Sequence, residues 1–409
     1  MKHIIALLLY FTACLSVGAQ KYVMSGTVTD KKTGKGIAYA TVKAFPSSTT
    51  VVTNEEGFFS LKQEERPEFI EVTHINYNAE RIQVAELPVS PLRIQLTPSA
   101  VLLQEVNVWT DDPRKLVDIA ISKIAQNYTA IPSLYKCFYR ETVMKRQRYT
   151  YIAEAVVDMY KTAYNRGIGR DKVAISKGRR LVSPRAGDTL SVKVLGGPAQ
   201  PLMLDVVKNA PFLLNDEALA DYAFSMETPT VIGNRSQFVV ALTPKHILPY
   251  ALYYGKLYID CETLAFTRVE LSLDMSDRDK ATAFMLVRKP AGVKFKPREL
   301  SCLVDYRFDG KVCHISYVRS NFRFSGDWKK RQFTSPFTVA CEMAVTDRLT
   351  DSIQPISGRD SFDSRDAFFD KVDYFLDPDF WQDYNIIEPT ETLDKAVNRL
   401  LKRHQSSKR

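Results

Sequence analysis

The sequence lacks the short motifs that identify common catalytic sites. It contains only five histidines in 409 residues, and none is followed three positions later by glutamate. Neither His-x-x-Glu nor His-Glu-x-x-His can therefore present zinc ligands on one helix face. There is also no Gly-x-Ser-x-Gly elbow for a nucleophilic serine and no P-loop. We expect a protein that is not an enzyme, with no catalytic residue, no bound cofactor and no metal site.

Cysteines are few and are not spaced as metal ligands. No Cys-x-x-Cys pair occurs, which excludes a zinc ribbon. Five cysteines follow the N-terminal leader, namely Cys137, Cys261, Cys302, Cys313 and Cys341. A two-residue turn at Asp309-Gly310 would place Cys313 opposite Tyr306, too far from Cys302 for a disulfide. We interpret the thiols as buried structural groups, although the sequence does not decide their pairing.

Long hydrophobic runs are absent except at the N-terminus. Lys2 precedes an apolar run from Ile4 to Val17, and Val17-Gly18-Ala19 supplies small residues for cleavage. The run is too short for a transmembrane helix, so residues 1–19 are interpreted as a signal peptide. A lipobox ending at Cys14 is the alternative. We expect an exported protein of the periplasm or outer-membrane periphery, with no transmembrane span.

Positively and negatively charged residues are mixed along the chain, except in one strongly basic segment. The formal net charge is +9, and the hydrophobic content of 45% is that of a folded protein. A length of 409 residues gives room for two or three domains. Residues 166–185 contain seven basic residues and one acidic residue. We predict a contact with an anionic lipid or glycan surface there, and a solvated hairpin is the alternative. Nucleic acid is not an expected partner of an exported protein. The predicted contact residues are Arg166, Arg170, Lys172, Lys177, Arg179 and Arg180.

The first part of the mature chain has the pattern of a small all-β module. Short alternating apolar runs between residues 25 and 77 are separated by turn-rich segments, including one at Asn54-Glu55-Glu56-Gly57. Further strands are expected at Ile82–Val84 and Leu92–Leu96. About seven short strands in this stretch predict a β-sandwich.

Several fixed positions of this module resemble the carboxypeptidase-regulatory-like domain. They are Gly26-x-Val28-x-Asp30, Ala40-Thr41-Val42, Thr53-Asn54-x-x-Gly57-x-Phe59 and Thr73-His74-Ile75-Asn76-Tyr77. The resemblance covers about residues 21–97 and implies a transthyretin-like sandwich of the bacterial cell envelope, without peptidase activity. The strand-like segment Gln104–Val108 resembles the exit of such modules. Asn76 stands where the family commonly has glycine, and asparagine tolerates the same left-handed backbone.

The remaining sequence predicts a sheet with few helices. Residues 112–128 have helical spacing behind an Asp112 cap, and period-two strands then continue from Tyr135 to Val345. The fold class is therefore mainly β, with a seven-stranded sandwich followed by a large antiparallel sheet covered by helices. We assign a sandwich at 20–98, a linker strand at 99–111, a sheet domain at 112–350 and a C-terminal segment with a last helix at 351–409. The second part is similar in outline to half-barrel lipoprotein-carrier folds, which is a likeness of architecture only.

These patterns favour a non-enzymatic envelope protein that acts as a binding or assembly factor, with an envelope protein, anionic lipid or glycan as its partner. One alternative is a hydrolase of envelope polymers or glycans, because carboxylates from separated loops leave no local signature. Another is a carrier of an apolar, lipid-like ligand in the concavity of the sheet. Two acidic loops, Asp274–Asp279 and Asp377–Asp383, are candidates for a carboxylate pair, and helix capping or solvated charge is the simpler interpretation.

Overall fold

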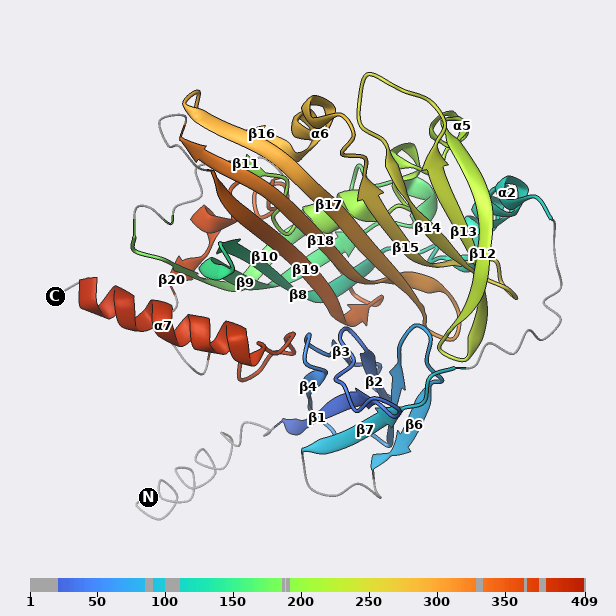
Figure 1. Cartoon of the computed structure of the whole chain (residues 1–409). Helices are drawn as coiled ribbons and strands as arrows, with labels where there is room; N and C mark the ends of the chain where they lie inside the picture. Colours follow the sequence, from blue (N-terminus) through green and yellow to red (C-terminus); the bar gives the residue numbers. More distant parts are fainter. Residues whose placement is uncertain are drawn as a thin grey trace, which may run out of the picture.

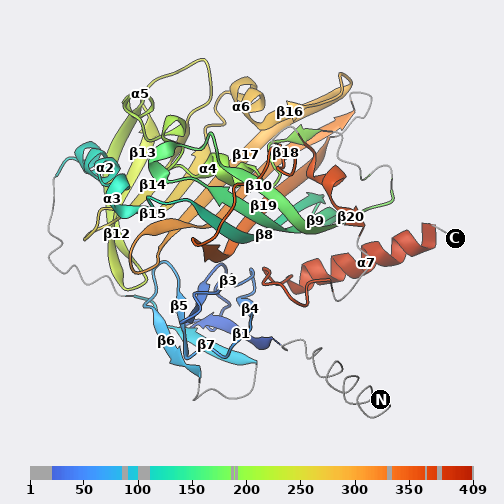
Figure 2. The same ribbon diagram turned by 180° about the vertical axis from the view of Figure 1, so that it is seen from behind.

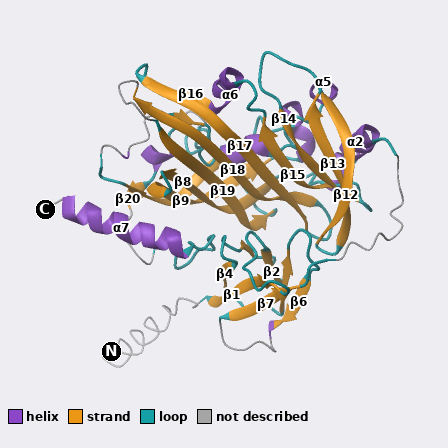
Figure 3. Cartoon of the chain, viewed as in Figure 1, coloured by secondary structure: helices purple, strands orange, loops and turns teal. Residues whose placement is uncertain are grey.

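The computed structural model describes residues 21–84, 91–99, 111–185, 188, 192–328, 334–363, 366–374 and 380–407. The predicted signal peptide, Cys14 and the Gln104–Val108 segment lie outside these residues. Strands dominate the described chain (Figure 3), with 49% of the residues in strands and 16% in helices. The prediction of a mainly β protein is confirmed.

A small sandwich of seven strands forms the N-terminal part, as predicted. Its two sheets have the orders β4-β1-β7 and β3-β2-β5-β6. Alternate residues such as Val28, Val42 and Val72 are fully buried between the sheets, and this burial is what the period-two pattern encodes. The strands are β1 (Tyr22–Asp30), β2 (Thr41–Phe45), β3 (Thr50–Val52), β4 (Phe58–Gln63), β5 (Phe69–Thr73), β6 (Glu80–Gln83) and β7 (Leu92–Leu96).

Two turn residues of the sandwich adopt the left-handed backbone that their sequence positions predict. Gly57 has φ +83°, and a Cβ there would lie 2.4 Å from the carbonyl oxygen of Val28, so only glycine fits. Asn76 has φ 66° and retains this turn without glycine. Its backbone N–H donates to the carbonyl of Val231 at 2.9 Å, which ties the sandwich to the large sheet.

The large sheet is open and almost wholly antiparallel. Its strand order is β12-β13-β14-β15-β17-β18-β19-β8-β9-β10-β20, and only the short edge strand β20 runs parallel to its neighbour. Figure 1 shows the sheet above the sandwich. Its strands are β8 (Ser133–Lys145), β9 (Arg148–Lys161), β10 (Lys172–Val182), β12 (Tyr222–Ile232), β13 (Arg235–Pro244), β14 (Tyr253–Asp260), β15 (Phe266–Leu273), β17 (Val293–Phe308), β18 (Cys313–Trp328), β19 (Ser335–Leu349) and β20 (Asp373–Tyr374). A separate pair is formed by β11 (Lys193–Val194) and β16 (Leu286–Arg288).

The turn between β17 and β18 differs from the sequence-based expectation. Phe308 pairs with Cys313, so the loop contains four residues rather than two, and Cys313 does not face Tyr306. Asp309 explains the longer loop, because its carboxylate accepts from the backbone N–H groups of Lys311 and Val312 at 2.9 Å each. All five described cysteines are free thiols, and four of them are buried.

Helices and loops cover one face of the large sheet (Figure 2). Helix α2 is capped by the Asp112 carboxylate, as predicted, and buries Leu116, Val117 and Ala120. Residues 202–219 add Leu204, Leu214 and other buried side chains to the same continuous core. The helical segments are α2 (Pro113–Ser122), α3 (Ile124–Asn127), η3 (Tyr164–Arg166), α4 (Gln200–Leu204), η5 (Ala210–Phe212), α5 (Asp216–Ala220), α6 (Arg278–Met285) and η6 (Phe368–Lys371).

Four fully buried charges hold the covering segment to the sheet. Lys161 on β9 forms ion pairs with Asp205 at 2.7 Å and with Asp171 at 3.4 Å. Lys208 completes the cluster with an ion pair to Asp171 at 2.7 Å, and all four side chains have no exposed surface. Tyr306 also donates to Asp205 at 3.0 Å. Because each charge has a partner, the cluster is tolerated in an apolar surrounding and fixes where residues 205–208 lie.

The opposite face of the sheet contacts the sandwich and the C-terminal segment. Arg140 on β8 forms an ion pair with Glu154 at 2.7 Å and donates to the carbonyl of Ile387 at 2.6 Å. The indole of Trp381 donates to Glu154 at 3.0 Å. Helix α7 (Glu391–Ser407) then buries Leu393 and Leu400 against β9 and β10. No helix among the described residues is long and apolar enough to cross a membrane.

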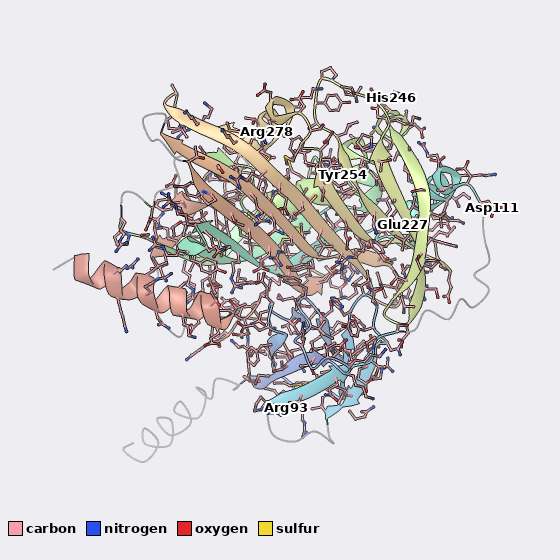
Figure 4. The ribbon with its side chains drawn as sticks, viewed as in Figure 1. Arg93, Asp111, Glu227, His246, Tyr254 and Arg278 are labelled. Carbon is pink, nitrogen blue, oxygen red and sulfur yellow. The ribbon has the colours of Figure 1, made fainter. Side chains whose placement is uncertain are left out.

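We predict that the buried cluster contributes strongly to stability. The substitution Asp205→Asn leaves Lys161 with a single, more distant counter-ion, so the free energy of unfolding should fall by about 3–5 kcal/mol. Glu227, on the edge strand β12 (Figure 4), is a suitable control because it pairs with Lys256 at the surface, where both side chains are 40% exposed. Glu227→Gln should change stability by less than about 1 kcal/mol in the same urea titration. Equal effects of the two substitutions would contradict this account.

Candidate functional site

A cavity of about 690 Å³ remains where the covering segments do not fill the sheet. It lies against β8, β9, β10 and β19 and is closed by residues 192–197, 288–290 and 366–369. Its volume is in the range of small-molecule binding sites. Most of the wall is apolar and includes Val143, Val182, Val194, Val339, Phe368 and Phe369.

The carboxyl group of Glu141 interrupts this apolar wall on β8, and Asp188 and Asp366 also line the cavity. On β8 the residues Tyr135, Cys137, Tyr139 and Val143 belong to the core of the covered face, and Glu141 shares their side of the strand by alternation. Tyr139 donates to its Oε2 at 3.1 Å, and the backbone N–H of Gly197 donates to the same atom at 3.2 Å. Burial raises the pKa of Glu141, because the charged form loses its hydration, and the hydrogen bonds only partly offset this.

The local backbone around Gly197 brings the chain close to this carboxyl group. Gly197 has φ +84°, a conformation that favours glycine, and a Cβ on the preceding Gly196 would lie 3.1 Å from Glu141 Oε2. The Gly196-Gly197-Pro198 sequence predicts an irregular segment, but only the structure shows that this segment lies against the half-buried carboxyl group of Glu141.

Polar groups also occur elsewhere in the cavity. The hydroxyl of Tyr151 is buried and has no hydrogen-bond partner among the residues that the structure describes. Arg288 and Lys289 line the cavity and are exposed to solvent, so its opening is basic. The arrangement therefore combines apolar walls, a hydroxyl without a partner among the described residues, the half-buried carboxyl group of Glu141, and two exposed basic side chains.

The six basic residues predicted to contact an anionic surface do not lie together. Arg166 and Arg170 are exposed, and Lys172 is half-buried. Three others contact aromatic residues of the C-terminal part: Lys177 lies over Phe380 at 4.2 Å, Arg179 over Trp381 at 5.0 Å, and Arg180 over Phe369 at 3.8 Å. Contact of these six residues with an anionic surface remains a prediction.

Two further titratable groups, one from the acidic loop Asp274–Asp279 and one from β18, have local structural roles. Asp277 caps helix α6 by accepting from the backbone N–H groups of Asp279 and Lys280. His314 is buried, and burial lowers its pKa to about 3, so it is neutral. Within the described ranges, no group of three or more His, Cys, Asp or Glu side chains is arranged to hold a metal ion.

Comparison with known proteins relates the N-terminal part to one family. Residues 24–108 match the model of the CarboxypepD_reg-like domain, in agreement with the predicted resemblance. This match covers less than half of the chain. No curated protein matches the sequence.

Several solved structures match part of this chain at low similarity. An outer membrane lipoprotein-sorting protein domain from Vibrio parahaemolyticus is 10% identical, with a TM-score of 0.27 over 61% of this chain and 97% of that chain. A DUF1329 family protein from Desulfovibrio piger is 10% identical, with a TM-score of 0.25 and coverages of 60% and 95%. A LolA superfamily protein from Nitrosomonas europaea is 12% identical, with a TM-score of 0.21 and coverages of 58% and 95%. At these TM-scores the likeness carries no argument about fold or function.

Sequence reasoning did not identify Glu141 as a site residue. Its position in the sequence could have identified it. Glu141 falls on the same side of the predicted strand as Tyr135, Cys137, Tyr139 and Val143, so a glutamate there interrupts an apolar face. Such a residue is either paired or functional, and the sequence alone does not show which residues close over it.

We predict that Glu141 makes the stability of the protein dependent on pH. The unfolded chain releases this proton near pH 4.5, whereas the folded protein retains it to a higher pH. The contribution of Glu141 is therefore most favourable below pH 4.5 and is lost as the pH rises through the raised pKa, by about 1.4 kcal/mol for each unit of the shift. Glu141→Gln should remove this loss. The variant should become more stable than the wild type at neutral pH, with the difference vanishing towards pH 4 in urea titrations.

Proposed function

We propose that this protein is an exported, non-enzymatic protein of the cell envelope that binds an amphiphilic ligand with a substantial apolar part. The observation that carries the proposal is the apolar cavity of about 690 Å³ beneath β8, β9, β10 and β19. Burial of an alkyl or terpenoid group there would remove its surface from water, which is favourable in proportion to the buried area. The proposal combines the binding role and the carrier role that the sequence left open.

The polar groups of the cavity suggest how such a ligand would be oriented. Arg288 and Lys289 at the opening would face an anionic group, since they lie in solvent and carry positive charge. Inside, the Tyr151 hydroxyl would find a hydrogen-bond partner on the ligand. A neutral Glu141 would also be able to donate a hydrogen bond, which a carboxylate cannot do.

Part of the concave face is not available to a ligand. Side chains of residues 202–219 belong to the same core as the strands, so a long groove along the whole sheet is not expected. The proposed ligand is therefore confined to the end of the sheet near β10 and β11. The hydrolase alternative has no specific support. Two aspartates also line the cavity, but each has a local partner. Asp188 accepts a hydrogen bond from Ser183 at 2.7 Å, and Asp366 forms an ion pair with Lys371 at 3.1 Å.

A binding experiment tests the proposal directly. The protein would be purified after expression in an envelope, its bound lipids extracted and identified by mass spectrometry, and the delipidated protein titrated with a fluorescent fatty acid. We expect one saturable site per chain. Absence of both a co-purified amphiphile and saturable probe binding would overturn the proposal.

Two substitutions on one strand locate the site. Val339→Phe adds a ring on the cavity side of β19 and should weaken probe binding by about tenfold or more, because an added ring occupies ligand volume. Thr338→Phe adds the same ring on the opposite side of the same strand and should leave binding unchanged. Both variants should first be checked for cooperative unfolding, so that lost binding is not confused with lost fold.

A further inference from the structure

A second, smaller cavity lies between the sandwich and the large sheet. It has a volume of about 230 Å³ and is lined from the sandwich by β2 and β5, and from the sheet by β13, β15 and β17. Contacts on both sides fix its walls: Ile75 pairs with Ile232, and the Asn234 side chain accepts from the backbone N–H of Ala79 at 2.7 Å. We refer to this cavity as the interface cleft.

Lys43 on β2 faces the interface cleft without a close counter-ion. Its residue is only 7% exposed. The ammonium group lies over the ring of Phe45 at 4.4 Å and, among the residues that the structure describes, has no carboxylate within ion-pair distance. Burial lowers its pKa, and the nearby charge of Arg307 adds to this effect, while Glu71 and Asp309 act against it.

Arg307 on β17 reaches the same place from the large sheet. One terminal nitrogen of its guanidinium group donates to the hydroxyl of Thr50. Thr50 is the cross-strand neighbour of Lys43 on β3, and Glu71 is its neighbour on β5. Its buried Nε has no hydrogen-bond partner among the described residues. Asp309 lies nearby but forms its ion pair with Arg348, at 2.6 Å. Burial lowers the pKa of Arg307 to about 10.

The other charges around the cleft are already paired. Arg235 forms an ion pair with Asp260 at 2.6 Å, and Arg268 with Asp305 at 3.2 Å. Glu71 is 3.3 Å from Arg81. The buried Nδ1 of His74 lacks a hydrogen-bond partner in the described part of the chain, and burial lowers the pKa of this ring to about 4, so it adds a neutral polar group.

We propose that the interface cleft binds a small oxyanion, a phosphate or carboxylate group, between Lys43 of the sandwich and Arg307 of the large sheet. Lys43 is buried, and Arg307 is half-buried with a buried Nε that has no hydrogen-bond partner among the described residues. Cations held in this way without a close carboxylate are costly unless an anion neutralises them. A guanidinium with an unused Nε and an ammonium group are the usual donors to such groups. The bound anion would strengthen the contact between sandwich and sheet. This inference does not depend on the ligand proposed for the larger cavity.

Anion titrations of the full chain test this inference. Binding of inorganic phosphate, succinate and glycerol 3-phosphate would be measured by calorimetry and by the shift of the thermal midpoint, at constant ionic strength kept with sodium chloride. We expect saturable binding of at least one probe and a matching rise of the midpoint. Preference for glycerol 3-phosphate over inorganic phosphate would indicate a headgroup as the source of the anion, and the reverse would indicate a free anion.

Three variants separate the cleft from general surface charge. Lys43→Met and Arg307→Met should each weaken binding by about tenfold or more. Arg319→Met is the matched control, because Arg319 lies at the same interface and pairs with Glu55 at 2.8 Å outside the cleft. It should leave anion binding unchanged.

Stability without anion gives an independent readout. Lys43→Met should make the anion-free protein more stable than the wild type, since an uncompensated buried charge is removed. The inference is overturned if no probe shows saturable binding beyond the chloride control, or if Lys43→Met binds as tightly as the wild type. Should Arg307→Met fail to fold, the Lys43 variant alone decides the question.

Discussion

The large antiparallel sheet has one strongly apolar face, and covering this face is the constraint on which the rest of the structure depends. Helix α2 and residues 202–219 bury their apolar side chains against it in one continuous core. The Lys161, Asp171, Asp205 and Lys208 cluster determines where the covering segment lies, because these charges are tolerated only when all of them are paired. Where this cover ends, the cavity with Glu141 remains.

The second face of the sheet differs from the first because it carries charged as well as apolar side chains. It is buried where the sandwich and the C-terminal segment pack on it. Arg140, Glu154 and Trp381 form one hydrogen-bonded group there, supplied by two strands and a distant segment. Paired charges of this kind give the contact a specific geometry rather than a large net stability. The interface cleft is the part of this contact where Lys43 and Arg307 have no close carboxylate among the described residues.

Much of the architecture could be predicted because strand periodicity is a local property. Val28 and Val72 alternate with half-buried residues in the sandwich, and Val339 and Cys341 do so in β19. The Asp112 cap and the left-handed Asn76 were also readable from adjacent residues. The length of the loop after β17 was not predicted correctly. The Asp-Gly pair favours a two-residue turn, whereas the hydrogen bonds of Asp309 stabilise a loop of four residues.

The sequence by itself determined the strand pattern, the family of the first module and the lack of familiar catalytic motifs, since each depends on residues close together in the chain. Only the tertiary structure decided which residues share a cavity. Glu141 and Gly197 are hydrogen-bonded although 56 positions separate them in the sequence, and Arg307 and Thr50 are hydrogen-bonded over a separation of 257 positions. No local pattern encodes such separations. They result from strand order and from the way the sandwich docks, because burial acts on surfaces that the completed fold brings together.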